Sequence, residues 1–265
     1  MTRSAKPGGG PVDGKPPVRP GFPARLQTAT PQPKALSPAR PVKTTSPTAG
    51  LGMDSQAVRA SMVRKLAAQG ISHPQVLAAM GQVERHRFVD SALAGQAYED
   101  TALPIGLEQT ISKPSVVARM LDLLMQGRTQ LAGRVLEIGT GCGYQAAVLA
   151  QLASEVYSME RLRGLHEKAR ENLRQLRLSN LHLLLGDGML GYAKGAPYAA
   201  IIAAAGGQAV PVAWTDQLAV GGRLVAPVVT AGGSQALLVV DKQADGLRQI
   251  VLESVHFVPL KSGVD

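Results

Sequence analysis

The chain has 265 residues, of which 45% are hydrophobic, 3% aromatic and 18% charged, a length that allows one large domain or two small ones. It contains no run of about eighteen apolar residues, only one cysteine and five scattered histidines, which argues against an integral membrane protein, a disulfide framework and a metal site. The formal net charge of +9 suggests a nucleic-acid-binding protein until it is divided along the chain.

Nearly all of the positive charge lies in the first fifty residues. They hold eight Lys and Arg and one acidic residue, whereas residues 51–265 hold 20 basic and 18 acidic residues. Eleven of the 18 prolines also lie in residues 1–50, whose apolar residues follow neither helical nor strand spacing. We therefore predict a disordered basic tail over residues 1–50, with no secretory signal or transit peptide, that is either solvated or weakly attached to an acidic partner. Met53, close to the first predicted helix, is an alternative translation start.

Residues 51–130 are predicted to form a helical cap and a substrate loop. Three helices are predicted, with starts near Asp54 or Ser55, at Pro74 and at Pro114. Gly70 can end the first of them. Residues 98–109 have the composition of a loop, and Ser112 lies where it can cap the third helix.

After residue 133 the pattern alternates between strands and helices, without internal repeats. The predicted strands cover residues 134–138, 155–159, 181–185, 199–203, 223–227, 236–240 and 251–257, with helices over about 144–152 and 162–176. Such alternation is typical of a mostly parallel sheet covered by helices on both faces. The last two strands follow each other without a helix, as in an antiparallel hairpin. We therefore predict an α/β fold with a mostly parallel, Rossmann-like sheet over residues 131–265, a C-terminal antiparallel hairpin and a helical N-terminal cap.

The most informative segment places Gly139, Gly141 and Gly143 between a predicted strand and a predicted helix. Glycines at such a turn let the backbone approach a ligand, and the start of the helix offers free N–H groups. A dinucleotide site requires GxGxxG, but its third glycine would fall at Tyr144. S-adenosylmethionine has no phosphate and does not impose that spacing. We therefore predict S-adenosylmethionine as the cofactor.

Three acidic residues lie at or beside the ends of successive predicted strands. Glu137 is placed to receive the ammonium group of the cofactor's methionine portion, and Glu160 can accept hydrogen bonds from both ribose hydroxyls. Asp187, which precedes Gly188, can accept a hydrogen bond from the adenine amino group. Each of the three can also have a purely structural role, as a solvated surface group, a paired buried charge or a turn residue. Together they predict a nucleoside pocket at one edge of the sheet.

At this point the sequence resembles the protein-L-isoaspartate O-methyltransferase family. The resemblance rests on residues 102–106, 109–112, 135–144, 186–188, 221–228 and 255–260, and extends from about residue 55 to residue 263. It implies methyl transfer from S-adenosylmethionine to the free α-carboxylate of L-isoaspartyl residues in damaged proteins, with D-aspartyl residues as a second candidate substrate. The ester then recloses to a succinimide, which starts repair. By this resemblance Ser112 is the active-site serine, and Thr110 and Ile111 contact the cofactor.

The sequence also departs from the family's usual pattern. Cys142 stands where the family usually has Ser, Ala199 replaces an Asp, and Ala-Ala-Gly-Gly at residues 204–207 replaces a loop that usually resembles Thr-Ala-Ala-Pro-Pro. That loop borders the substrate side, so peptide preference or turnover can differ. Two alternatives stay open: a methyltransferase of the same fold that acts on another acceptor, such as RNA, and a cofactor-binding protein that has lost catalysis.

The remaining expectations concern partners and location. The near-neutral charge of residues 51–265 argues against a nucleic-acid partner. We expect a monomeric enzyme whose partners are isoaspartyl proteins and peptides, with no membrane partner. The cysteine usage is typical of a cytoplasmic protein.

Overall fold

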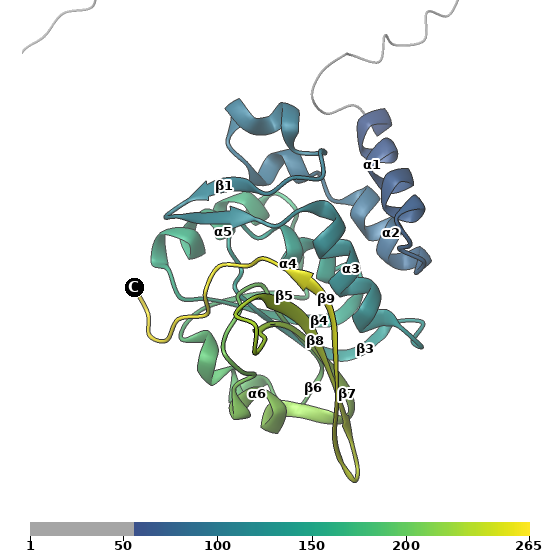
Figure 1. Cartoon of the computed structure of the whole chain (residues 1–265). Coiled ribbons are helices and arrows are strands. Elements are labelled where there is room, and N and C mark those ends of the chain that lie inside the picture. The colour runs from purple at the N-terminus through teal and green to yellow at the C-terminus, as the bar shows by residue number, and fades with distance from the viewer. Residues whose placement is uncertain (1–55) are drawn as a thin grey trace, which may run out of the picture. The chain divides into compact units, whose positions relative to one another are not determined.

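A seven-stranded sheet with the order β5-β4-β3-β6-β7-β8-β9 forms the centre of the part of the chain that the computed structural model describes, residues 56–265 (Figure 1). Its strands are β3 (Leu131–Ile138), β4 (Ala153–Glu160), β5 (Leu181–Leu185), β6 (Tyr198–Ala203), β7 (Leu218–Val229), β8 (Gln235–Gln243) and β9 (Gly246–Val255). The predicted tail and the predicted caps Asp54 and Ser55 lie outside the described residues.

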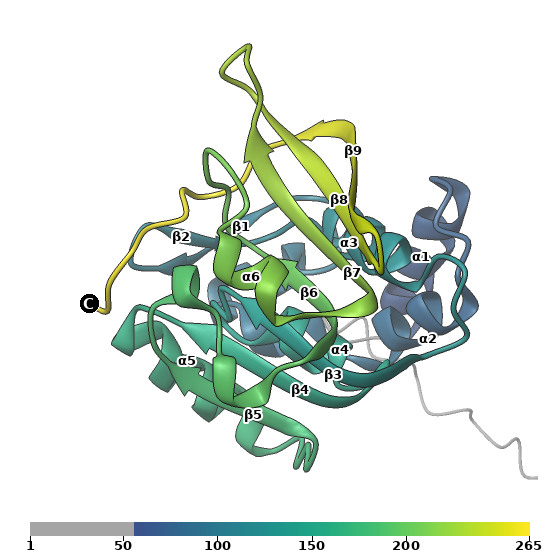
Figure 2. The same ribbon diagram turned by 90° about the horizontal axis from the view of Figure 1, so that it is seen from below.

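The pairing of the strands confirms the predicted mostly parallel sheet. Strands β5, β4, β3, β6 and β7 pair in parallel, whereas β8 is antiparallel to both β7 and β9. The predicted hairpin is β8–β9, which lies at one edge of the sheet (Figure 2). β9 begins at Gly246, five residues before its predicted start, because the chain reverses at residues 244–245 and Gly246 adopts a φ of 141°.

Helices cover both faces of the sheet, but unequally. The helices are α1 (Gln56–Ala68), α2 (Pro74–Gln82), α3 (Pro114–Met125), α4 (Tyr144–Leu149), α5 (Arg163–Arg174) and α6 (Val212–Gln217), with short 3-10 helices η1 (Arg85–Phe88), η2 (Ser91–Gln96), η3 (Gly188–Leu190) and η4 (Ala193–Gly195). Successive strand residues point to opposite faces: Val135 joins the larger core, which contains buried residues of α1 to α5, and Leu136 joins the smaller core around Trp214 of α6. No helix within residues 56–265 is long and apolar enough to cross a membrane.

The central position of β3 decides where a ligand can bind. β3 pairs with β4 on one side and with β6 on the other. The chain adds β4 and β5 on one side of β3 and then crosses to add β6 and β7 on the other, so the strand order reverses at β3. In open α/β sheets, ligands bind at the carboxyl ends of the strands where the order reverses. The glycine loop leaves β3 at this point.

One prediction about the N-terminal part is wrong, and one alternative role is not found. Residues 98–109, predicted as a loop, contain β1 (Leu103–Gly106), which pairs with β2 (Gln109–Ile111) as an antiparallel ribbon. The N-cap of α3 is Lys113, without a side-chain capping bond, so Ser112 does not cap this helix. The predicted end of the first helix is confirmed, since α1 stops at Ala68 and Gly70 adopts a φ of 97°.

Candidate functional site

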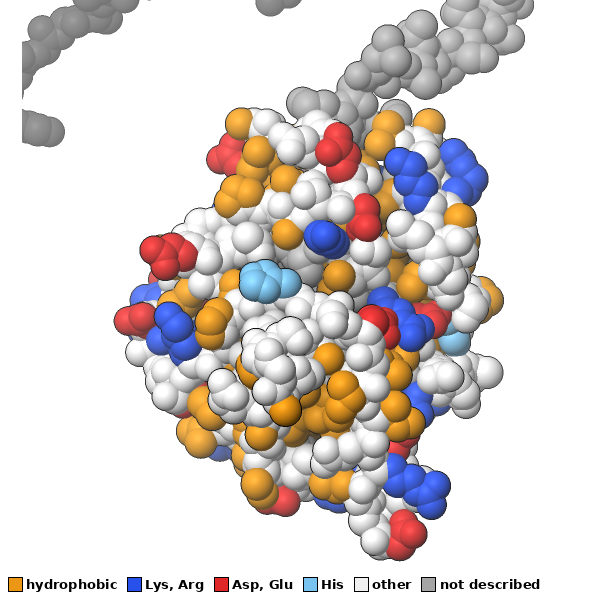
Figure 3. Space-filling model, viewed as in Figure 1, with side chains coloured by type: hydrophobic (Ala, Val, Ile, Leu, Met, Phe, Trp, Pro, Cys, Tyr) orange, Lys and Arg blue, Asp and Glu red, His pale blue; other side chains and the backbone are white. Residues whose placement is uncertain are grey.

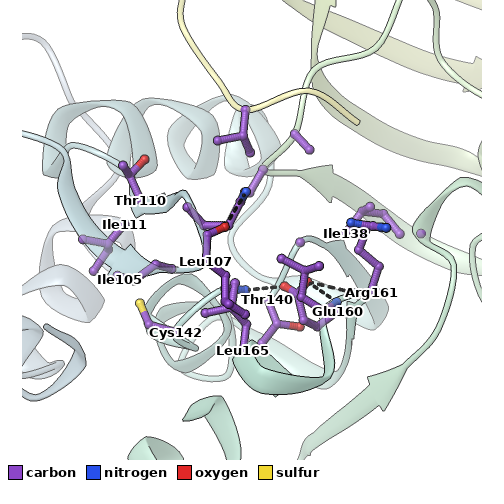
Figure 4. A pocket seen from close by; sticks show the side chains of 18 of the residues that line it. Ile105, Leu107, Thr110, Ile111, Ile138, Thr140, Cys142, Glu160, Arg161 and Leu165 are labelled. Atoms are coloured by element: carbon purple, nitrogen blue, oxygen red, sulfur yellow. Dashed lines mark hydrogen bonds between the residues drawn. The ribbon is translucent and has the colours of Figure 1, made fainter. Parts of the chain in front are cut away.

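A cavity of about 970 Å³ lies at the carboxyl ends of β3 and β4. It is lined by the β1–β2 ribbon, the glycine loop, the segment that follows β4, Ala204 and Ala205 after β6, and residues 258–261. Thr110 and Ile111 of the ribbon lie on one side of the cavity, and Glu160 and Arg161 lie on the other (Figure 4). Segments far apart in the sequence therefore meet at the edge where the sequence predicted a pocket.

The glycine loop requires a backbone that other residues adopt only with strain. Gly139, Gly141 and Gly143 have φ values of 91°, 56° and 93°, in the region that favours glycine. Gly139 and Gly141 line the cavity. Gly143 does not; it is the N-cap of α4, and a Cβ there would lie 2.8 Å from Cδ1 of Leu173. Gly143 therefore acts by letting α4 approach α5.

Glu160 lies at the end of β4, buried at 5% exposure, and lines the cavity. Its Oε2 accepts a hydrogen bond from the backbone N–H of Gly141 at 2.8 Å. Its Oε1 accepts from the N–H groups of Arg161 and Leu162, both at 2.9 Å. These bonds fix the carboxylate against the glycine loop, and because each carboxylate oxygen can accept about two hydrogen bonds, Oε2 can also accept one from a ribose hydroxyl.

Glu137 lies behind the loop rather than in the cavity wall. Its carboxylate is fully buried, and Oε2 accepts a hydrogen bond from Oγ of Ser158 at 2.5 Å. Oγ of Ser158 is also 2.6 Å from Oγ1 of Thr140, which lines the cavity. Oε1 has no hydrogen-bond partner among the described residues. Burial raises the pKa of Glu137 to about 8, although the polar side chains of Ser158 and Gln145 oppose the shift.

Asp187 also lies outside the cavity wall. Its Oδ1 accepts a hydrogen bond from the N–H of Met189 at 2.8 Å, and its Oδ2 accepts from the N–H of Gly263 at 2.7 Å. The first bond caps η3, and the second holds the C-terminal segment. The neighbouring Gly188 does line the cavity, and a Cβ there would lie 2.6 Å from Cγ2 of Ile138.

The chain that follows β1 brings the candidate active-site serine to the same cavity. Thr110, Ile111 and Ser112 all line it. The side chain of Ser112 is half-buried and forms no hydrogen bond with the described residues, whereas its carbonyl oxygen accepts one from Nη2 of Arg85 at 2.8 Å. A hydroxyl without a partner at the wall of a cavity can hydrogen-bond a bound carboxylate.

Sequence reasoning missed Ser158, Thr140 and Arg85. Ser158 lies within a predicted strand, where a single serine gives no signal of its bond to a neighbouring strand. Thr140 lies between two glycines of the loop, and a single threonine there gives no signal of its contact with Ser158. Arg85 lies two residues from Arg87, which is exposed, and nothing local to the sequence separates the buried arginine from the exposed one.

Comparison with known proteins gives consistent matches. Residues 57–265 match the sequence model of a family described as protein-L-isoaspartate(D-aspartate) O-methyltransferase. A protein-L-isoaspartate O-methyltransferase of Methylibium petroleiphilum is 56% identical over 264 residues, which cover 93% of this chain and 97% of that protein. One of Leptothrix cholodnii is 56% identical over 275 residues, which cover 95% and 97% of the two chains.

Solved structures share the fold. A protein-L-isoaspartate O-methyltransferase superposes with a TM-score of 0.69 and 28% identity, over 78% of this chain and 67% of that one. A Plasmodium falciparum protein, solved in complex with S-adenosyl-L-homocysteine, has a TM-score of 0.66 and 24% identity, over 77% of this chain and 98% of its own. The second likeness shows the fold alone. The residues matched by the family model include both the glycine loop and Ser112.

Proposed function

Because the chain belongs to the protein-L-isoaspartate(D-aspartate) O-methyltransferase family, we propose that it transfers a methyl group from S-adenosylmethionine to the free α-carboxylate of isoaspartyl residues in proteins. The single observation that carries the proposal is one cavity lined by the glycine loop, Glu160 and Ser112. A cofactor site and an acceptor site must meet in this way for direct transfer. The main-chain nitrogen of the next residue then attacks the methyl ester and releases methanol, and water opens the resulting succinimide in part to normal aspartate.

Methyl transfer to a carboxylate requires few catalytic groups from the protein. A carboxylate is already ionised at neutral pH, so it needs no general base to attack a methyl group. The hydroxyl of Ser112 donates a hydrogen bond to one carboxylate oxygen and leaves the other free to attack in line. The apolar wall formed by Ile105 and Ile111 keeps water out of the path. When bound, S-adenosylmethionine supplies an electrophilic methyl group on its sulfonium.

The residues of this site fit such a cofactor. The glycine loop allows close approach of the backbone, and Glu160 presents a carboxylate oxygen at the cavity wall. We propose that Thr110, Ile111, Gly139, Gly141, Glu160 and Gly188 contact the cofactor. Glu137, Gly143 and Asp187 act through their neighbours, by the bonds and packing described above.

We extend the proposal to partners and location. Basic and acidic side chains are interspersed over the face that Figure 3 shows, which argues against a nucleic-acid partner on that face. D-aspartyl residues are a second substrate. The enzyme acts as a cytoplasmic monomer, with residues 51–265 as its catalytic unit.

The decisive experiment compares an isoaspartyl peptide with the aspartyl peptide of the same sequence, using S-adenosylmethionine labelled in its methyl group. We expect label in the isoaspartyl peptide alone. Equal labelling of the two peptides would refute the proposal. Label in RNA without label in the peptide would support a methyltransferase that acts on another acceptor. Cofactor binding, measured by calorimetry, without any methyl transfer would support a protein that has lost catalysis.

A further inference from the structure

Arg85 of η1 is a buried cation beside the proposed site. Its side chain is completely buried, yet it forms no ion pair with an acidic residue among those described. Burial lowers the pKa of Arg85. A buried charge without a carboxylate partner is costly. Nε and Nη2 are satisfied by other groups, whereas Nη1 has no hydrogen-bond partner among the described residues.

Those groups are the main-chain carbonyls of the segment that leads to Ser112. Nε of Arg85 donates to the carbonyl of Ala97 at 2.8 Å, and Nη2 donates to the carbonyl of Ser112 at 2.8 Å. Nη2 also lies 3.4 Å from the carbonyl of Thr101. These carbonyls belong to three positions before and after the β1–β2 ribbon, which a planar fork of donors can reach at the same time.

The same guanidinium contacts the cofactor side of the cavity. Its central carbon lies 4.9 Å from the centre of the Tyr144 ring. Tyr144 is fully buried, is the first residue of α4 after the glycine loop, and lines the cavity. Its ring also packs edge-on against Phe88 of η1. Arg85 therefore connects the segment that carries Ser112 to the end of the glycine loop.

We propose that Arg85 is a positioning residue that sets the distance and angle between Ser112 and the glycine loop. The inference rests on the proposed function, because it concerns the alignment of an acceptor held by Ser112 with a cofactor held by the loop. The rate of direct methyl transfer depends steeply on that alignment, and a shift of about 1 Å in the position of a reacting group can lower the rate about 100-fold. Arg85 does not line the cavity, so it acts through the loops that it joins.

The test replaces Arg85 with Lys, which keeps the charge but can neither span the carbonyls nor stack on the ring. The matched control is Arg223→Lys. Arg223 also donates to main-chain carbonyls, those of Leu123 at 2.9 Å and Gln126 at 3.4 Å, and it does not line the cavity. Unlike Arg85, it also forms a two-bond ion pair with Asp241, at 2.6 and 2.9 Å, so its replacement by Lys disturbs at least as many contacts. It holds the far end of α3, whereas Arg85 holds the segment just before α3. Loss of general stability should therefore appear in both variants.

Wild type is first assayed with the isoaspartyl peptide, because its inactivity would refute the proposed function rather than the role of Arg85. We then measure the melting temperature, the Kd for S-adenosylhomocysteine, and kcat and KM for the peptide, well below the lower melting point. We expect Arg85→Lys to lower kcat at least about 10-fold with a Kd within about threefold of wild type, and Arg223→Lys to leave kcat within about twofold.

Three outcomes would overturn the inference: an unchanged kcat in Arg85→Lys, an equal loss of kcat in Arg223→Lys, or a loss of cofactor affinity that parallels the loss of kcat. Should Arg85→Lys not fold, Arg85→Gln gives the same reading without a buried charge, because its amide can reach only one of the carbonyls. A folded Arg85→Gln with wild-type kcat would equally refute the role.

Discussion

Glu160 and Asp187 use their carboxylate oxygens to accept main-chain N–H groups, whereas Glu137 leaves one oxygen without a partner among the described residues. Their positions differ as well: Glu160 belongs to the cavity wall, whereas Asp187 and Glu137 lie outside it. Glu160 lines the cavity, Asp187 holds the C-terminal segment, and Glu137 is linked to the wall through Ser158 and Thr140. We therefore expect substitutions of Glu160 and Glu137 to have different effects.

Replacing Glu160 with Gln should weaken cofactor binding by about 1–3 kcal/mol, or roughly 5- to 150-fold in Kd. The amide has only one acceptor oxygen, and its NH₂ group would face the N–H of Gly141 or those of Arg161 and Leu162. Calorimetry with S-adenosylhomocysteine measures the change. The control Glu171→Gln removes the same charge from an exposed position outside the cavity. An unchanged Kd in a folded Glu160→Gln protein would contradict the assignment.

Replacing Ser112 with Ala should lower kcat about 10- to 100-fold, the loss of one hydrogen bond to a charged group. Because the hydroxyl bonds no described residue and does not cap α3, the melting temperature and the cofactor Kd should stay unchanged. Steady-state kinetics with the isoaspartyl peptide and calorimetry test both parts. A weaker Kd with an unchanged kcat would show that Ser112 belongs to the cofactor site instead.

The stability of the cofactor-free protein should depend on pH through Glu137. Its pKa is raised from 4.5 to about 8 in the folded state, so between these values the folded chain holds a proton that the unfolded chain releases. The free energy of unfolding contributed by this group therefore falls as pH rises from about 4.5 to about 8. Glu137→Gln cannot titrate and should lose that slope.

Thermal melting of wild type and Glu137→Gln at pH 5 and pH 8 measures the effect. The melting temperature of wild type relative to the variant should be lower at pH 8 than at pH 5. The exposed Glu171→Gln should show no such change. Equal differences at both pH values would mean that Glu137 is ionised throughout this range.

At the level of elements, the parallel strands were predictable because burial on both faces makes them continuous apolar runs. Residues 135–138 of β3 are all buried. The β1–β2 ribbon was not predictable, because its turn residues Leu107 and Glu108 adopt φ values of 50° and 58°, a conformation usually filled by Asn or Gly. The site was predictable where glycines and acids follow strands. It was not predictable at Arg85, whose partners are main-chain carbonyls 12 to 27 residues away.

The contact between α4 and α5 gives a prediction about Gly143. An alanine there would adopt a φ of 93° and place its Cβ 2.8 Å from Cδ1 of Leu173. Left-handed strain and overpacking together should destabilise the fold by about 2–4 kcal/mol. Gly232→Ala, with its nearest atom 3.9 Å away, should change stability by less than about 0.5 kcal/mol. Chemical denaturation measures both, and wild-type stability of Gly143→Ala would contradict the packing argument.

At the scale of the whole molecule, the site is built from two distant parts of the sequence. The β1–β2 ribbon and Ser112 come from the N-terminal helical part, whereas the glycine loop and Glu160 come from the sheet. Both parts belong to the same compact unit of the chain. Ser112 and the glycine loop are therefore held together by one core, and every element needed for the proposed transfer lies within residues 56–265.

The last prediction follows for residues 1–50. They carry eleven prolines, eight basic residues and no periodic apolar pattern, so they offer little apolar area to bury. A chain that begins at Met53 should melt within about 2 °C of the full chain, since a larger shift needs roughly 0.5 kcal/mol or more. It should also methylate isoaspartyl peptides at the same rate as the full chain, both at low and at physiological salt.

Two results would contradict this expectation, and they have different causes. A melting temperature several degrees lower for the short chain would mean that the tail stabilises the catalytic part by roughly 1 kcal/mol or more. Slower methylation confined to large acidic proteins at low salt would mean that the tail attracts substrates electrostatically, because salt screens such attraction beyond about 10 Å at 0.1 M. Intact-mass measurement of the native protein shows whether the residues before Met53 are present in the cell. If they are absent, the short chain is the one that must carry the activity.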